Sequence, residues 1–194
     1  MKKMMLFIQL LAVLLSFGSC GKSKGVTPVK EEEKPVETTN FRVIGYLFAK
    51  GRLAAEMDKL DYSKITHLNV AFINPDADGV FRPADDLAAA VKKAHDNKVK
   101  ILFSFGGGNP PAHLMPMLQP DKRAAFVKGL IKVMTDYGFD GVDVDLEGDY
   151  IDGNYEAIVT ELSAALKPMK KLLTVAVVTW TSPKISNKAL GLFD

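Results

Sequence analysis

Apolar positions along this chain follow two different periods, which predict alternating strands and helices. Short apolar runs rich in β-branched and aromatic residues predict strands over Phe41–Phe48, Lys64–Ile73, Val99–Phe105, Phe139–Glu147 and Leu172–Trp180. Helical spacing between these runs predicts helices over Gly51–Leu60, Ala84–Asn97, Pro120–Gly138 and Asn154–Leu166. After the last strand, we expect Ser182–Asp194 to form a linker and a short helix.

Strands that alternate with helices are typical of an α/β fold, with a parallel sheet and helices outside it. The second, third and fifth runs are almost continuously apolar, as expected for strands covered on both faces. A doubly wound open sheet and a (β/α)8 barrel both fit this order of elements. No Gly-x-Gly-x-x-Gly turn follows the first strand, which disfavours the dinucleotide-binding form of the open sheet.

The start of the chain resembles an export signal. Lys2 and Lys3 precede an apolar run, Met4–Phe17, which is too short for a comfortable membrane span and suits the core of a signal peptide. The segment Gly18-Ser19-Cys20 follows and contains the only cysteine of the chain. This order resembles the lipobox of bacterial lipoproteins, and the alternative is an ordinary secretory signal with an incidental cysteine.

We therefore expect residues 1–19 to be a lipoprotein signal peptide and Cys20 to be lipidated. Residues 20–40 contain almost nothing large and apolar, and include the charge run Glu31–Glu33, so they predict a flexible tether. Together these features predict an exported protein, anchored by its lipid to the bacterial cell envelope at the outer membrane. The membrane is one expected partner, and the domain at residues 41–194 would face the periplasm or the exterior.

Charge is nearly balanced along the chain. It has 25 basic and 23 acidic residues, which give a formal net charge of +2. The basic residues are scattered and form no stripe with aromatic residues, so nucleic acid is not an expected partner. The three histidines have long and irregular spacings, so no metal site is expected from them.

The fourth predicted strand carries the candidate chemistry, in the acids Asp143, Asp145 and Glu147. Because side chains alternate faces along a strand, these acids are expected on one face, with apolar residues on the other. Like charges on a buried strand raise each other's pKa, so one carboxyl group can keep its proton and act as a general acid. The acids also lie at the carboxyl end of their strand, where barrel enzymes have their active sites.

Two other interpretations of these acids stay open at the level of sequence. One is a solvated acidic strand at the edge of the sheet. The other is a calcium loop that begins at Asp143. The twelfth position of an EF-hand loop would then be Asn154, where a bidentate glutamate is needed, and the segment before the acids looks like a strand.

Several segments of the chain resemble glycoside hydrolase family 18. Asp140–Glu147 is similar to that family's Asp-x-x-Asp-x-Asp-x-Glu signature, with all four acids present. Ser104–Gly107 resembles its Ser-x-Gly-Gly motif, Lys64–Phe72 its second strand and Gly45-Tyr46 its first. The resemblance covers Phe41–Asp194 and implies a (β/α)8 barrel, of which about the first five β/α units are present in this chain.

Two departures from the family pattern change what we expect. Many members have Trp and Tyr beside the catalytic Glu, where this chain has Leu146 and Gly148, so the subfamily and the local sugar contacts stay open. The family's Met-x-Tyr-Asp strand and its eighth-strand Trp have no counterpart before Asp194. Because a barrel of this kind needs about 250 residues, we expect the N-terminal part of a catalytic domain that is not a self-sufficient enzyme.

The resemblance also implies roles for individual residues. Glu147 would protonate the glycosidic oxygen and later activate water, Asp145 would orient the substrate's acetamido group, and Asp143 would share a proton with Asp145. Asp140 would be a structural residue of the motif. The substrate contacts implied or expected are Tyr46, Phe72, Ser104, Gly106, Gly107 and Trp180.

The activity that the resemblance implies is retaining, substrate-assisted hydrolysis of β-1,4-linked N-acetylglucosamine polymers, as in chitinases. The expected partner is an oligo- or polysaccharide that contains N-acetylglucosamine, and the mechanism needs no cofactor and no metal. An endo-β-N-acetylglucosaminidase acting on N-glycans shares the fold and the motif and is one alternative. An inactive sugar-binding fragment is another, although the presence of Glu147 argues against a lectin.

Overall fold

The computed structural model of the protein describes residues 41–48 and 52–194. The predicted signal peptide, Cys20 and the tether lie outside the described residues. The strands are β1 (Ile44–Phe48), β2 (His67–Ala71), β3 (Lys100–Gly107), β4 (Gly141–Leu146) and β5 (Leu172–Val175). The α-helices are α1 (Leu53–Met57), α2 (Leu87–Asp96), α3 (Leu114–Met117), α4 (Arg123–Tyr137), α5 (Tyr155–Leu166) and α6 (Asn187–Leu190). Short 3-10 helices are η1 (Tyr62–Lys64), η2 (Gly148–Tyr150), η3 (Lys167–Met169) and η4 (Ser182–Lys184).

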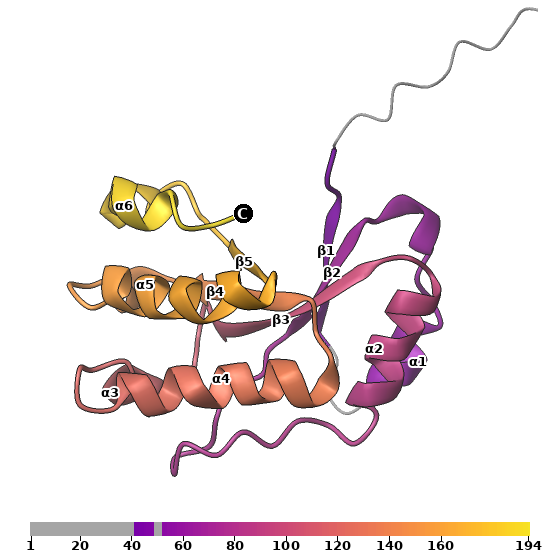
Figure 1. Ribbon diagram of the computed structural model, residues 1–194, viewed down its shortest axis with the longest axis horizontal. Coiled ribbons are helices and arrows are strands. Elements are labelled where there is room, and N and C mark those ends of the chain that lie inside the picture. Colours follow the sequence, from indigo (N-terminus) through magenta and orange to yellow (C-terminus); the bar gives the residue numbers. More distant parts are fainter. Residues whose placement is uncertain (1–40, 49–51) are drawn as a thin grey trace, which may run out of the picture. The chain divides into compact units, whose positions relative to one another are not determined.

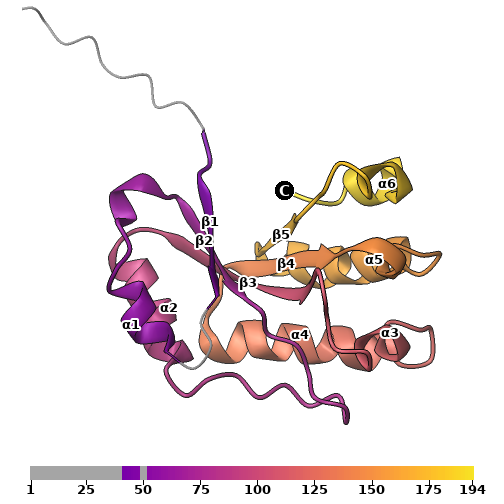
Figure 2. The same cartoon turned by 180° about the vertical axis from the view of Figure 1, so that it is seen from behind.

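The order of the strands distinguishes the two predicted architectures. The strands form one sheet in the order β1-β2-β3-β4-β5, and every neighbouring pair is parallel. A doubly wound sheet would reverse its order at one point, whereas a barrel adds each strand beside the one before it. Helices α2, α4 and α5 follow their strands on the same side of the sheet (Figures 1 and 2). The fold is therefore a partial (β/α)8 barrel, as the sequence predicted.

The two faces of the sheet differ in chemistry. One face packs against the helices in a continuous apolar core, to which the strands contribute Leu68, Val70, Ile101, Phe103, Phe105, Val142, Val144, Leu146 and Leu173. The other face, which would line the inside of a barrel, carries buried polar side chains, namely His67, Asn69, Ser104, Asp143, Asp145 and Thr174. The alternation predicted for the acidic strand is thus confirmed on β4.

The end of α4 follows its sequence signal. Gly138 was predicted to close this helix, and it adopts the left-handed conformation with φ of 78° and ψ of 26°. Its N–H donates to the carbonyl of Met134. A residue with a Cβ is disfavoured in this conformation, which is why glycine is the usual residue at this position. Helix α3 was not predicted, because its four residues are too few to display a helical period.

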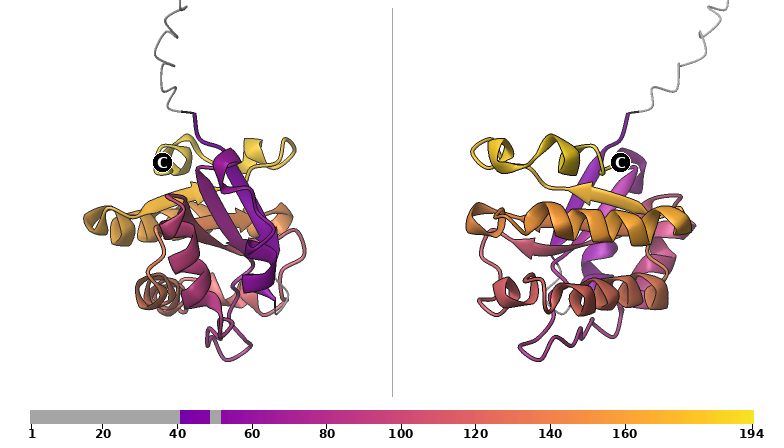
Figure 3. Two further views of the ribbon diagram at one scale, coloured as in Figure 1. Left: turned by 90° about the vertical axis from the view of Figure 1, so that its right-hand side faces the viewer. Right: turned by 60° about the vertical axis from the view of Figure 1, so that its left-hand side comes forward.

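The prediction that the fifth strand extends to Trp180 is wrong. Strand β5 ends at Val175, and the N–H of Ala176 makes the last ladder bond, to the carbonyl of Val144. β4 itself continues to Leu146, so its last two residues have no paired strand residue on the β5 side. The residues after Val175 are as apolar as a strand, so the sequence did not indicate this boundary. The linker and short helix expected over Ser182–Asp194 are confirmed as η4 and α6 (Figure 3, in yellow).

Among the residues that the structure describes, 41–48 and 52–194, no helix combines the length and the apolar character that crossing a membrane requires.

The first testable prediction concerns the contact between β4 and β5 at Gly141. A Cβ built on Gly141 would overlap the carbonyl oxygen of Leu172 and lie 2.8 Å from its carbonyl carbon. Backbone atoms cannot move aside as a flexible side chain can, so Gly141→Ala should lower the free energy of unfolding by about 1–3 kcal/mol. Urea unfolding of the protein measures this change.

Gly153→Ala is the matched control, because a Cβ there meets nothing within 4 Å. It should leave the urea midpoint almost unchanged. Equal midpoints for the two variants would show that the β4–β5 contact does not exclude a side chain.

Candidate active site

Three carboxyl groups form a row along β4 that runs from the interior toward the carboxyl end of the sheet. Asp143 is 1% exposed and Asp145 is 7% exposed, while Glu147 follows the strand directly and is half-buried. The Glu147 carboxylate lies against the backbone of Gly108, since a Cβ built there would be 3.6 Å from Oε1. The structure therefore brings together the three acids that the sequence singled out. We call them the acid row.

Asp143 is held by hydroxyl groups from the two outer strands of the sheet. The Tyr46 hydroxyl on β1 donates to Asp143 Oδ2 at 2.7 Å, and the Thr174 hydroxyl on β5 donates to Asp143 Oδ1 at 2.5 Å. These lengths are typical of hydroxyl groups that donate to an ionised carboxylate. Burial raises the pKa of Tyr46, and the charge of Asp143 raises it further, so Tyr46 stays a neutral donor.

Asp145 has a different environment from Asp143. Its Oδ1 atom is buried and has no hydrogen-bond partner within the described part of the chain. Burial raises the pKa of Asp145 from 3.8 to about 6, helped by the charges of Glu147 and Asp143. The sequence predicted that crowding would raise the pKa of a carboxyl group in this row, and the group with a raised pKa in the structure is Asp145.

Both alternative interpretations of the acids are wrong. The acidic strand is not at an edge, because β4 pairs with β3 on one side and β5 on the other. Asp143 and Asp145 lie on a strand rather than in a loop between two helices, so they do not begin an EF-hand loop. Within residues 41–48 and 52–194, no group of three or more His, Cys, Asp or Glu side chains is arranged to hold a metal ion.

Gly106 and Gly107 bring β3 close to the acid row. Both have positive φ, of 99° and 97°. A Cβ on Gly106 would overlap the carbonyl oxygen of Asp145, and one on Gly107 would lie 2.7 Å from the Phe72 ring. These positions therefore require glycine for close approach. The Phe72 ring in turn packs edge-on against Phe48, with ring centroids 5.6 Å apart, so it lies between β3 and β1 at the end of the sheet.

Asn74 is a residue of the site region that sequence reasoning missed. Its Oδ1 accepts from the N–H of Gly106 at 2.8 Å, and its Nδ2 donates to the Gly106 carbonyl at 3.0 Å. This pair of bonds fixes the backbone beside Asp145. The only sequence signal was a polar residue directly after an apolar strand, which is also common in ordinary loops.

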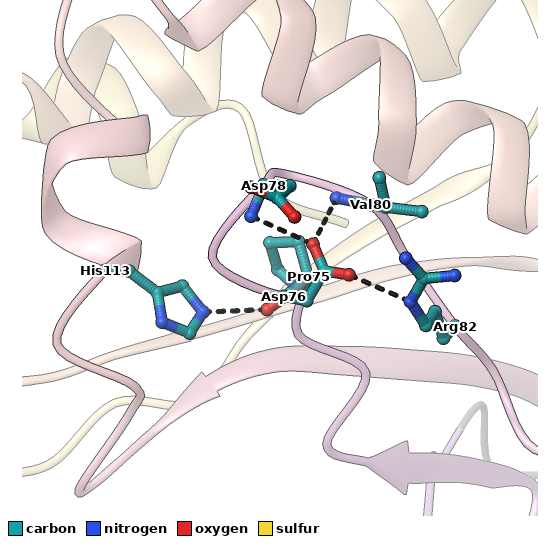
Figure 4. Close-up of polar contacts among 6 residues, drawn as sticks. All are labelled: Pro75, Asp76, Asp78, Val80, Arg82 and His113. Carbon is teal, nitrogen blue, oxygen red and sulfur yellow. Dashed lines mark hydrogen bonds and ion pairs between the residues drawn. The ribbon is translucent and has the colours of Figure 1, made fainter.

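The loop after β2 is braced by its own side chains (Figure 4). The Asp76 carboxylate accepts from the N–H groups of Asp78 and Val80, at 3.0 and 2.9 Å, and from Arg82 Nε at 2.9 Å. His113 Nε2, just before α3, lies 2.9 Å from the carbonyl oxygen of Pro75. These bonds join the loop to the segment after β3, and so hold Phe72 and Asn74 in place.

Two buried polar groups lie on the inner face beside the acid row. Ser104 on β3 is in register with Asp143 on β4, while Asn69 on β2 is in register with Leu102, two residues before Ser104. Ser104 Oγ and Asn69 Oδ1 are buried and have no hydrogen-bond partner among the described residues. Ser104 is thus placed beneath the mouth of the site, at the depth of Asp143.

Trp180 lies elsewhere than the sequence predicted. It was expected at the end of the fifth strand, but it stands in a turn before η4 and is 73% exposed. It lines a cavity of about 440 Å³ together with Glu147 and with residues of the loops after β3 and β4, among them Asn109 and Tyr150. The turn therefore places the exposed indole ring of Trp180 at the rim of the cavity beside Glu147.

Asp140 lies away from the acid row, before the start of β4. Its Oδ2 accepts from the N–H of Ile101 at 2.9 Å and contacts His95 Nε2 at 2.8 Å. These contacts join the beginning of β4 to β3 and to α2. The geometry suits the structural role that the motif implied for this residue.

The strand order, the outer helices and the acid row at the carboxyl end of an interior strand define the class of protein. This is the arrangement of a (β/α)8-barrel protein with its candidate site at the carboxyl ends of the strands. The model of the family "Glycosyl hydrolases family 18" matches residues 42–188. The chain belongs to this family.

Many of the similar proteins are chitinases by name, and others are named chitinase-like. The chain is 33% identical over 102 residues to Chitinase B of Serratia marcescens, a match that covers 43% of this chain and 20% of that protein. The solved chitinase ChiB of Flavobacterium johnsoniae superposes with a TM-score of 0.68 at 33% identity, over 79% of this chain and 52% of that one. A chitinase of Bacteroides thetaiotaomicron has a TM-score of 0.63 at 26% identity, over 79% and 51%. The chain thus spans about half the length of the solved chitinases it matches.

The second testable prediction concerns the pH dependence of stability that Asp145 causes. Its pKa is raised from 3.8 to about 6 in the folded protein. Between these values the unfolded chain has lost a proton that the folded protein keeps, so stability falls as the pH rises through this range. Asp145→Asn removes this pH-dependent loss of stability, because the amide does not titrate. Above about pH 7 it should unfold with a free energy higher by on the order of 1–2 kcal/mol, after allowance for solvent near the open end of the site.

Urea unfolding of both proteins between about pH 3.5 and pH 8 measures this difference. Asp149→Asn, an exposed acid on η2, is the control and should follow the wild type throughout. A difference between wild type and Asp145→Asn that does not change with pH would contradict the assignment.

Proposed function

We propose that this chain provides catalytic residues of a chitinase-type glycosidase, which cleaves β-1,4-linked N-acetylglucosamine polymers by a retaining, substrate-assisted mechanism. The observation that carries the proposal is the acid row, in which the buried Asp145, with its pKa raised to about 6, stands two residues before Glu147 at the carboxyl end of β4. A carboxyl pair that holds one proton near neutral pH is suited to general acid catalysis. Family membership and the chitinases among the similar proteins support the substrate class.

In the proposed reaction, Glu147 delivers the proton of the Asp145–Glu147 pair to the glycosidic oxygen. The bond from the anomeric carbon to that oxygen breaks, and its electron pair goes to the leaving sugar. The carbonyl oxygen of the substrate's own acetamido group bonds to the anomeric carbon and forms an oxazolinium ion. An intramolecular nucleophile is already in place, which removes much of the entropic cost of attack.

Loss of the proton leaves the Asp145–Glu147 pair fully ionised beside the cationic intermediate. The pair gains negative charge while positive charge develops on the sugar. This attraction stabilises the transition state more than the ground state. Asp145 is the acid proposed to face the acetamido N–H. Glu147 then takes a proton from water, the hydroxide bonds to the anomeric carbon, and the acetamido oxygen is released. The configuration at that carbon is retained overall.

We assign substrate contacts to the aromatic residues at the mouth of the site. Trp180 is 73% exposed and borders the same cavity of about 440 Å³ as Glu147, so it is suited to stack on a sugar ring of the leaving group. Phe72 lies between Gly107 and Phe48 beside the acid row. Tyr46 contributes through its hydrogen bond to Asp143.

The third testable prediction is that Glu147→Gln removes hydrolysis but keeps sugar binding. An amide has nearly the shape of the carboxyl group but cannot deliver a proton, so kcat should fall by about 10²–10⁴-fold or more. The assay uses the full-length product of the gene and an aryl chitobioside, and calorimetry with a chitooligosaccharide measures binding. The dissociation constant should change only a few-fold.

Asp136→Asn is the control, because this exposed acid on α4 pairs with Lys132 on the helix surface and has no part in the proposed chemistry. It should turn over at the wild-type rate. Turnover by Glu147→Gln at a rate near that of the wild type would overturn the role of Glu147 as the acid.

We also propose that the protein is exported and held at the bacterial cell envelope by lipid on Cys20. The support is the sequence pattern alone, an apolar run followed by Gly18-Ser19-Cys20 with no other cysteine. A lipid anchor followed by a polar tether at residues 21–40 would allow the domain to reach insoluble polysaccharide.

The fourth testable prediction follows from this proposal. The wild-type protein should partition with membranes and incorporate labelled lipid, whereas Cys20→Ser should be released or remain as unprocessed precursor. Fractionation and immunoblotting in the native host measure both properties. A wild-type protein that is soluble, and a Cys20→Ser variant that is processed identically, would exclude lipidation.

A further inference from the structure

Thr174 is a polar residue within an otherwise apolar strand, and its side chain reaches the acid row. It lies on β5 in register with Asp143, and it is buried with 9% exposure. Its neighbour Leu173 belongs to the apolar core on the opposite face. The Thr174 hydroxyl donates to Asp143 Oδ1 at 2.5 Å. Thr174 is therefore a buried hydroxyl donor in direct contact with Asp143 of the acid row.

Asp143 has both of its carboxylate oxygens occupied by donors. Tyr46 supplies one hydroxyl from β1 and Thr174 supplies the other from β5. A buried carboxylate is stabilised as an anion when donors occupy its oxygens. A proton that bound Asp143 would displace one of these hydroxyl groups or force it to turn away.

Asp145 offers the contrasting environment. Its buried Oδ1 has no hydrogen-bond partner in the part of the chain that the structure describes. It stands between the fixed charge of Asp143 and the carboxylate of Glu147, two residues away on either side. A proton on Asp145 relieves the repulsion from both neighbours, whereas a proton on Asp143 would sacrifice a strong hydrogen bond.

The other groups that face Asp143 and Asp145 do not titrate in the same range. Burial raises the pKa of both Tyr46 on β1 and Tyr155 on α5, and the acids raise it further, so both stay neutral. The buried side chains that face the acids from β2 and β3 are Asn69 and Ser104, which carry no charge. Asp145 is therefore the acid of the row whose pKa is raised toward neutral pH.

We infer that Thr174 is a positioning residue of the reaction, because its hydroxyl holds Asp143 as an anion and thereby keeps the reactive proton on the Asp145–Glu147 pair. The inference rests on the proposed function for its catalytic consequence. Without the hydroxyl, Asp143 competes for the shared proton and Glu147 delivers it less often. No group other than the shared proton is transferred in this step.

The fifth prediction compares Thr174→Val, which keeps the shape and loses the hydroxyl, with Thr174→Ser, which keeps the hydroxyl and loses the methyl group. The measurement uses the full-length product of the gene. Carbon-13 NMR of the aspartate carboxyl groups follows the titration of Asp145, and kcat and KM for an aryl chitobioside are recorded across pH.

Thr174→Val should move the titration midpoint of Asp145 below the wild-type value of about 6. The reason is that a partly protonated Asp143 repels the Asp145 charge less. The acid limb of the kcat profile should move with it, and kcat should fall about tenfold with KM little changed. Thr174→Ser should restore both the midpoint and kcat. If Thr174→Val does not fold, Thr174→Ala takes its place in the comparison with Thr174→Ser.

Two results would overturn the inference. The first is an Asp145 midpoint that is the same in Thr174→Val and in the wild type. The second is a Thr174→Ser variant as impaired as Thr174→Val, since packing of the methyl group would then explain the defect. The NMR titration needs no turnover, so it decides the role of Thr174 even if the wild type fails to cleave chitooligosaccharides and the proposed function is wrong.

Discussion

A single buried anion, Asp143, constrains the inner face of this sheet. A carboxylate that is 1% exposed needs donors, and the structure supplies them from β1 through Tyr46 and from β5 through Thr174. These two strands are the outer strands of the sheet, so the anion joins its ends across the concave face. Strand order, curvature and the position of the acid row are therefore linked by one pair of hydrogen bonds.

The same constraint explains why neighbouring acids behave differently. Asp143 and Asp145 are both aspartates on one strand face, yet only Asp143 has hydroxyl donors on both of its oxygens. Asp145 has burial and two like charges instead, and its pKa rises to about 6. The two aspartates are chemically identical, but their surroundings give them different roles. One site can therefore hold a fixed negative charge on Asp143 and a transferable proton on Asp145.

The sequence predicted most of the fold, because the relevant signals are local. Period-two and helical spacing located the strands and the main helices, and Gly138 marked the end of α4. Predictions failed where the outcome depends on a partner distant in sequence. The apolar run after Val175 looked like a strand, but its pairing with β4 ends at Val175. Trp180 consequently lies in a turn rather than at a strand end.

For the site, the sequence by itself determined which acids share a face, since alternation along β4 follows from the chemistry of the chain alone. It also singled out Gly106 and Gly107 as part of a family motif, and the structure showed that both positions require glycine for close approach. Only the tertiary structure decided which acid keeps the proton. That choice depends on Tyr46, 97 residues away from Asp143, and on Thr174, 31 residues away. Such contacts form only when the sheet curves, because no local pattern specifies which hydroxyl groups meet a given carboxylate across strands.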